Sequence, residues 1–287
     1  SVVYGVYEHY KYTKSEKFLK DNLKMCEKAI DFLKKYLKDW LNIEGTEERD
    51  KDKVQEEIEN SVNRQGHKYH ISYDLWEMNE GIHLYSLASI YSAFDSILNI
   101  YKALGKNVSE FENNRLKEEK IQKNKRTIEN LQTQLKKYIN ENLYDEEKKS
   151  YVRNTEDRKM DISILGAITP FNMFKPKEKK IRNTVERINM SLRTYTGGYQ
   201  RFEQDNYMNG NPWPIANLWM TLYYLETGEK KKAKETFDFV VKTAGKHYLL
   251  GEQVDNSTLK PNWVIGLGWS HAMFIIVLEK LYKNNLK

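Results

Sequence analysis

The stretch YDLWEMNEG, residues 73–81, places an indole among three acids just before a run of apolar helix. Trp76 beside Glu77 would partly shield that carboxyl from water and favour its protonated form, as a general acid requires. A structural explanation covers some of the acids. Asp74 or Asn79 could cap the following helix, and one of the two glutamates in its first turn would suit the helix dipole.

A second stretch, GGYQRFEQDNYMNGNPWPIANLWMTLYYLETG at residues 197–228, crowds Gly, Asn and Tyr around a Pro-Trp pair and then continues as a helix. Pro212 and Pro214 suit a helix start, where a missing N–H is harmless. A glycine-rich entry loop would explain much of this composition, but not an Arg, a Tyr and a Trp in the same loop. Sugar sites combine flat aromatic faces with Arg, Asn and Asp for hydroxyl groups. The residues alone leave packing and carbohydrate binding equally open.

A third stretch, GEQVDNSTLKPNWVIGLGWSHAMF at residues 251–274, places Glu252 in an expected Gly-Glu-Gln turn and Trp263 before the last helix. A loop glutamate of this kind is most often a solvated acid. Three segments that each mix Trp, Gly and acids nevertheless favour one design, in which two carboxylates flank a sugar ring. A gap of about 6.5–9.5 Å between them would admit a water and invert the anomeric configuration.

The elements that must position these segments are helices. Apolar residues recur at helical spacing almost throughout, and no strand-like alternation lasts more than a few residues, which predicts an all-α protein. We expect helices over residues 2–12, 16–41, 52–60, 81–104, 109–142, 161–169, 178–193, 211–226, 230–243 and 266–284, of which 52–60 is polar and an excursion on the surface.

The breaks between helices are of two kinds. Short breaks such as TGEK, with Gly228 as a C-cap, alternate with long ones that carry the aromatic, glycine and acidic residues. This alternation predicts a toroid of helical hairpins with one working face. Tetratricopeptide-like repeats would instead need a period of about 34 residues, which the sequence lacks.

Composition limits the other classes of function. Of 287 residues, 39% are hydrophobic, enough for a sizeable core, and no apolar run approaches the roughly 20 residues of a membrane span. The net charge of +6 is spread over helix faces, which argues against nucleic acid as a partner. Cys26, alone in the chain, predicts a buried residue on an apolar helix face and no disulfide. We expect a cytoplasmic protein that uses no membrane and no cofactor. We also expect no metal site, since no loop has the spacing of an EF-hand calcium site.

The three stretches, in this order, resemble glycoside hydrolase family 15, the glucoamylases with related glucodextranases and trehalases, whose catalytic domain is an (α/α)6 barrel. YDLWEMNEG is similar to the family's DLWEE segment, which implies that Glu77 is the general acid. GEQVD with LGWSHAMF is similar to the EQ and WSHA segments, which implies that Glu252 is the catalytic base. RFEQDNYMNGNPW is similar to a family segment RYxxDxYxxGNPW. The expected substrate-binding residues are Tyr73, Asp74, Trp76, Arg201, Asp205, Tyr207, Asn211, Trp213 and Trp263.

The resemblance extends over essentially the whole chain, because DISILGAITPF from Asp161 is similar to the family's DASLL helix. Two departures stand out. Met78 replaces a second glutamate after the acid, and the family's barrel begins several helices earlier, commonly after a β-sandwich domain. We therefore expect residues 1–287 to form a single domain, a partial (α/α)6 barrel whose apolar faces are covered by an N-terminal segment of the same protein.

The resemblance implies an inverting, exo-acting glycoside hydrolase that releases glucose from the non-reducing ends of α-glucans or oligosaccharides. One alternative is a carbohydrate-binding relative without turnover. Another is a family member that acts on α-1,6 glucan or on trehalose. A purely helical scaffold would leave the Trp-rich loops unexplained.

Overall fold

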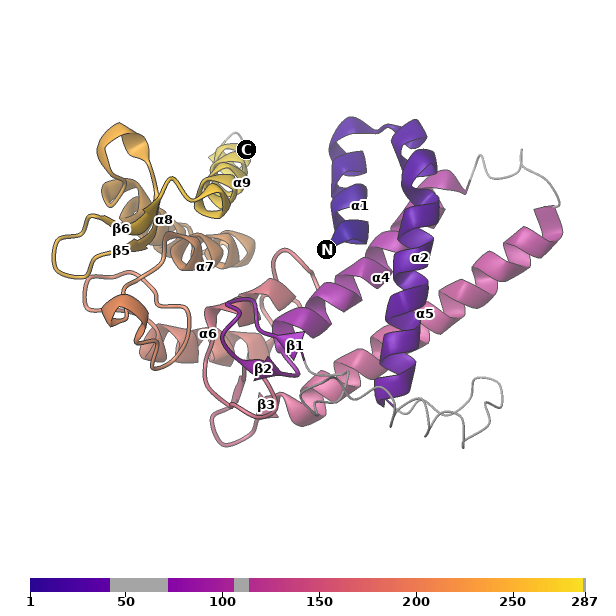
Figure 1. The fold of residues 1–287 in the computed structure, drawn as a ribbon, viewed down its shortest axis with the longest axis horizontal. Coiled ribbons are helices and arrows are strands. Elements are labelled where there is room, and N and C mark those ends of the chain that lie inside the picture. The colour runs from indigo at the N-terminus through magenta and orange to yellow at the C-terminus, as the bar shows by residue number, and fades with distance from the viewer. Residues whose placement is uncertain (42–71, 106–113, 286–287) are drawn as a thin grey trace. The chain divides into compact units, whose positions relative to one another are not determined.

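The computed structural model describes residues 1–41, 72–105 and 114–285, which belong to two compact units, Ser1–Glu141 and Asn142–Lys287 (Figure 1). The expected helix at 52–60 falls outside the described residues. Each unit is helical, and the described strands form only two-stranded antiparallel hairpins. The single-domain organisation stays a prediction. None of the described helices is long and apolar enough to cross a membrane.

The first unit is built from long helices, and three of them, α1, α2 and α4, pack against one another (Figure 1). Cys26 is fully buried on α2, as its apolar neighbours predicted. A short hairpin precedes α4 and carries the first of the three stretches. The elements are α1 (Val2–Thr13), α2 (Glu16–Leu41), β1 (Ser72–Tyr73), β2 (Glu80–Gly81), α4 (Leu84–Leu104) and α5 (Asn114–Asn142).

The second unit is centred on α7, which contacts α8, α9, β5 and the 3-10 helix η2 (Figure 1). Every residue from Pro214 to Tyr224 is buried, as expected for a helix surrounded by other elements. The elements are β3 (Tyr144–Asp145), β4 (Ser150–Tyr151), η2 (Ile162–Ala167), α6 (Lys179–Ser191), η3 (Tyr207–Asn209), α7 (Pro214–Thr227), α8 (Lys230–Lys242), η4 (Lys246–Tyr248), β5 (Gly251–Val254), β6 (Pro261–Ile265) and α9 (Gly268–Asn285).

Local signals fix both ends of α7. Pro214 is its first residue, where proline costs no hydrogen bond, and Gly228 follows its last residue with a φ of 84°. The N–H of Gly228 donates to Leu225 O, which closes the final turn. The helix start and the C-cap expected from the sequence are therefore confirmed.

Three local expectations are wrong. The expected helix at 161–169 is a 3-10 helix over Ile162–Ala167, where Asp161 accepts a hydrogen bond from Ser163 N and its backbone bridges Phe202. The helix expected from residue 81 begins at Leu84, because residues 80–81 form strand β2. Glu252 lies on strand β5 and not in a turn.

Candidate functional site

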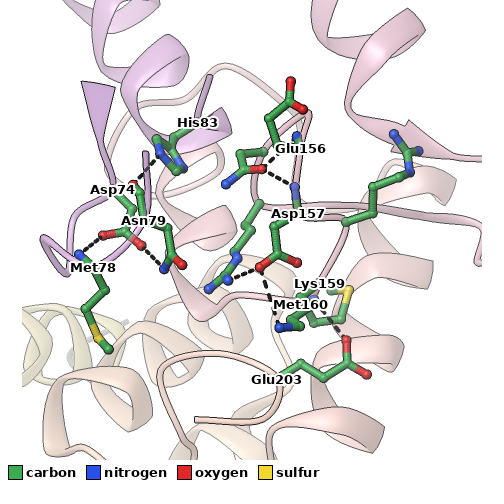
Figure 2. Close-up of polar contacts among 12 residues, drawn as sticks. Asp74, Met78, Asn79, His83, Glu156, Asp157, Lys159, Met160 and Glu203 are labelled. Carbon is green, nitrogen blue, oxygen red and sulfur yellow. Dashed lines mark hydrogen bonds and ion pairs between the residues drawn. The ribbon is translucent and has the colours of Figure 1, made fainter. Parts of the chain in front are cut away.

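Asp74 organises the loop between β1 and β2 in the first unit. Its Oδ1 atom accepts a hydrogen bond from Trp76 N at 3.1 Å. The same atom accepts from Met78 N at 2.9 Å, and its Oδ2 atom accepts from Asn79 Nδ2 at 2.7 Å (Figure 2). The N–H of Asp74 donates to Asn79 O. Both carboxylate oxygens are thus engaged by the loop itself. The expected capping of α4 by Asp74 or Asn79 is wrong, since the N-cap position is His83 and no side chain bonds there.

Glu77 sits at the tip of this loop in a left-handed conformation, with a φ of 57°. Such a backbone is strained for a residue other than glycine and persists only where its surroundings impose it. Here the N–H of Glu77 donates to Asp74 O, which closes a tight turn. The Glu77 side chain is exposed while Trp76 is buried, so the indole does not shield this carboxyl as expected. Tyr73 is also exposed, and its hydrogen bond to Glu80 raises the pKa of the phenol.

Arg201 is the centre of a buried cluster in the second unit. Its Nε and Nη2 atoms donate to the two carboxylate oxygens of Asp205 at 2.8 and 2.9 Å, a bidentate pair. The guanidinium also lies 4.7 Å from the Trp213 ring and 5.0 Å from the Tyr207 ring, at distances typical of cation–π contacts. Asp205 additionally accepts from Tyr207 N. The cluster holds one planar cation among aromatic faces.

Glu252 lies on β5 in the same unit, and one of its carboxyl oxygens lacks a hydrogen bond from the described part of the protein. Its Oε2 atom is buried and makes no hydrogen bond within the described part of the chain. Burial raises the pKa of this carboxyl, and the positive charge of Arg201 acts in the opposite direction. The structure thus brings Glu252 and Arg201 within electrostatic range of each other, although 51 positions separate them in the sequence.

Asn211 ties the Arg201 loop to the strand that carries Glu252. Its Nδ2 atom donates to Gln253 Oε1 at 3.3 Å, and its Oδ1 atom accepts from Asn256 N at 3.1 Å. The backbone continues the link, because Val254 N donates to Pro212 O at 2.9 Å. Asn211 is buried, so this bond pattern gives it a positioning role between two loops.

Trp263 forms an aromatic corner with Tyr207. The two rings meet edge to face, with centroids 6.4 Å apart, and Trp263 is 55% exposed. Trp213, by contrast, is buried next to Arg201. Of the expected residues, Arg201, Asp205, Tyr207, Asn211, Trp213, Glu252 and Trp263 gather in the second unit, whereas Tyr73, Asp74, Trp76 and Glu77 belong to one hairpin of the first.

Sequence reasoning missed two buried residues beside Arg201. Phe202 stacks under the Arg201 guanidinium at 5.0 Å and under that of Arg153 at 4.7 Å. The sequence signal for Arg153 was weak, because a single arginine in a long loop is usually solvated. Among the described residues, no three His, Cys, Asp or Glu side chains gather closely enough to hold a metal ion.

Comparison with known proteins places these segments in a family. The profile of the Glycosyl hydrolases family 15 matches residues 28–249, a range that includes the Glu77 hairpin and the Arg201 cluster and ends before Glu252. An uncharacterized glycosyl hydrolase of Methanocaldococcus jannaschii is 30% identical over 226 residues, which are 74% of this chain and 34% of that protein. Trehalase 1 of Sulfolobus acidocaldarius is 26% identical over 134 residues, 46% of this chain and 24% of that protein.

Solved structures show the same fold at low sequence identity. A protein described as a wild-type glycosidase matches with a TM-score of 0.60 and 18% identity, over 74% of this chain and 56% of that one. A glucoamylase of Saccharomycopsis fibuligera matches with a TM-score of 0.59 and 12% identity, over 81% and 61%. The chain therefore spans about a third or less of these two curated relatives and more than half of these two structures. The predicted all-α fold of the glucoamylase type is confirmed, and the chain belongs to the Glycosyl hydrolases family 15.

Proposed function

We propose that this protein is an inverting, exo-acting glycoside hydrolase that releases glucose from the non-reducing ends of α-glucans or oligosaccharides. The observation that carries the proposal is the Glu252 carboxyl, whose buried Oε2 atom has no hydrogen-bond partner among the described residues. A water bound there could donate its hydrogen bond to this oxygen, because no protein donor among the described residues already occupies it. Glu252 would accept its proton while the oxygen attacks the anomeric carbon.

Glu77 would supply the second half of the chemistry. As general acid it would donate a proton to the glycosidic oxygen, so that the leaving sugar departs as a neutral alcohol. The position of Glu77 at the tip of the turn that Asp74 organises supports this role, because a substrate can reach an exposed side chain there. Asp74 is then a positioning residue, and Met78 leaves Glu77 without an acidic neighbour on that side.

The remaining residues would bind and orient the substrate. Arg201 would hold hydroxyl groups, with Asp205 fixing the plane of its guanidinium, and the Tyr207–Trp263 corner would contact the sugar's C–H surfaces. Asn211 would keep the Glu252 strand in register with this loop. Holding the substrate in the geometry of attack supplies much of the rate enhancement of an enzyme. No cofactor enters this chemistry.

The experiment is to incubate the full-length protein with maltotriose and to follow glucose release by enzyme assay and its anomeric form by NMR. We expect β-glucose as the first product, and a loss of at least about 10²-fold in kcat for Glu77→Gln and for Glu252→Gln. The matched control is Glu226→Gln, which changes an exposed carboxyl paired with Lys280. This variant should retain full activity. Turnover that survives both site substitutions, or α-glucose as first product, would refute the assignment.

The match to a protein named trehalase favours one further assay. Trehalose and an α-1,6-linked trisaccharide should be tested beside maltotriose, since the linkage preferred by the chain is not set by the acid and base alone. Binding of maltose without release of glucose would favour a carbohydrate-binding protein.

A further inference from the structure

We propose that Arg153 and Asn154 form a second hydrogen-bond donor cluster, next to Arg201, that binds oxygen atoms of an uncharged sugar and so helps position it. The proposal rests on the function proposed above. It assigns a binding role to the loop between β4 and η2, residues 152–161, which neither the motifs nor the family match singles out.

The first observation is a set of buried donors without acceptors. Arg153 is 4% exposed and Asn154 is fully buried. Within the described part of the chain, Arg153 Nε and Nη1 and Asn154 Nδ2 make no hydrogen bond. Buried donors are almost always paired, because an unpaired one has lost its water and gained nothing. Three such atoms on two adjacent residues indicate that an external acceptor completes them.

The second observation is their position beside the Arg201 cluster. The guanidinium groups of Arg153 and Arg201 share the ring of Phe202, at 4.7 and 5.0 Å from its centroid. The two loops are also joined by backbone bonds, from Ile162 N to Arg201 O at 2.8 Å and from Glu203 N to Met160 O at 2.9 Å. The two loops are therefore joined next to the ring that their arginines share.

Side-chain contacts reinforce this junction and hold the donors in place. Glu203 Oε2 accepts from Met160 N at 3.2 Å, and Figure 2 shows this contact beside the ion pairs of Asp157. Asn154 Oδ1 accepts from Glu156 N at 2.9 Å and from Asp157 N, and these two bonds fix the amide group. The donors are thus rigidly oriented before any ligand arrives.

The charges of the loop select an uncharged ligand. Arg153 is paired with Asp157, which also lies 3.6 Å from Lys159 Nζ, and Arg158 is paired with Asp145 at 3.1 Å. Glu156, which is exposed, adds a third carboxylate, so the three cations just named face three carboxylates and the loop carries no net charge. A phosphate or carboxylate would need uncompensated positive charge. Hydroxyl oxygens need only donors, which is what Arg153 and Asn154 offer.

The test measures sugar binding by calorimetry in the full-length Glu77→Gln protein, in which turnover is suppressed. We expect Arg153→Gln to weaken maltose binding by about tenfold or more, and Asn154→Ala by less, in line with the loss of charged and neutral hydrogen bonds. Arg153→Lys keeps the pairing with Asp157 but lacks Nε, so its loss should be intermediate. Arg158→Gln, in the same loop, is the control and should bind as the parent does.

A series of monodeoxy maltosides identifies the contact itself. At one hydroxyl position, removal should weaken binding to the parent about tenfold and should have no further effect in Arg153→Gln, a coupling that lost stability alone cannot produce. Equal penalties in parent and variant at every position, no binding of a neutral sugar, or tighter binding of a uronic acid disaccharide would each overturn the inference. These outcomes are independent of the glucose-release assay, which tests the catalytic roles of Glu77 and Glu252.

Discussion

At the scale of single residues, Glu252 experiences two opposed influences. Burial raises the pKa of its carboxyl, and the nearby Arg201 lowers it. A general base must be ionised to accept a proton, so the balance decides how far into the acidic range it can work. Arg201 would thus serve both the substrate and the base, which ties binding and proton transfer to one guanidinium.

A pH profile tests this balance. In Arg201→Gln the opposing positive charge is gone, the pKa of Glu252 rises, and the ionised base appears only at higher pH. We therefore expect the acidic limb of kcat/KM against pH to move upward. Arg201→Lys keeps the charge and should leave the limb near its original place, although both variants bind sugar less well. A limb that moves downward in Arg201→Gln would contradict the electrostatic coupling.

The residues of the candidate site were predicted from the sequence, but their contacts within the protein could not be. The motifs indicated Asp74, Asp205 and Asn211 as substrate contacts. In the structure Asp74 and Asp205 engage their own loops, and Asn211 bridges to the neighbouring hairpin. Which donors a carboxylate meets depends on the path of the backbone in three dimensions. A sequence pattern does not specify that path in an irregular loop.

At the scale of elements, the long helices were predictable because their apolar periodicity spans many turns. The described ranges of α1, α2, α6, α7 and α8 agree with the expected ones within a few residues. Periodicity failed where elements are short. A six-residue 3-10 helix and a four-residue strand carry too few positions to distinguish from a turn, which explains the errors at Ile162–Ala167 and at Glu252.

Two glycines test the assigned backbone conformations, because replacing each by alanine should change the free energy of unfolding in opposite directions. Gly5 lies inside α1 with open space around an added Cβ, so Gly5→Ala should stabilise the protein by about 0.5–1 kcal/mol. Gly228 also has open space but a φ of 84°, so Gly228→Ala should destabilise it by about 1–2 kcal/mol. Urea unfolding measures both changes. The same sign in both variants would contradict the assigned backbone conformations.

At the scale of the whole molecule, α9 carries an apolar stripe on its outer side. Ile275, Leu278 and Tyr282 recur at helical spacing and are 66%, 47% and 65% exposed. The sequence predicted uncovered apolar faces of this kind, together with an N-terminal segment that covers them. The covering segment stays a prediction, as does the cytoplasmic location.

The stripe predicts how the 287-residue chain behaves when produced alone. Contiguous exposed apolar side chains promote association, so we expect concentration-dependent self-association and binding of a hydrophobic dye. Ile275→Lys should reduce both, measured by light scattering and dye fluorescence. Met190→Lys, at an exposed apolar residue on α6, should change neither. Equal effects of the two substitutions would show that the α9 stripe is not the cause.

The exposed indole at position 263 gives the chain an intrinsic optical probe. Trp76, Trp213 and Trp219 are buried, whereas Trp263 is more than half exposed and its ring meets that of Tyr207 edge to face. Light emission from an indole depends on whether water or a less polar group surrounds it. A sugar stacked on this ring would therefore shift the emission of the unlabelled protein, and occupancy could be read without any attached dye.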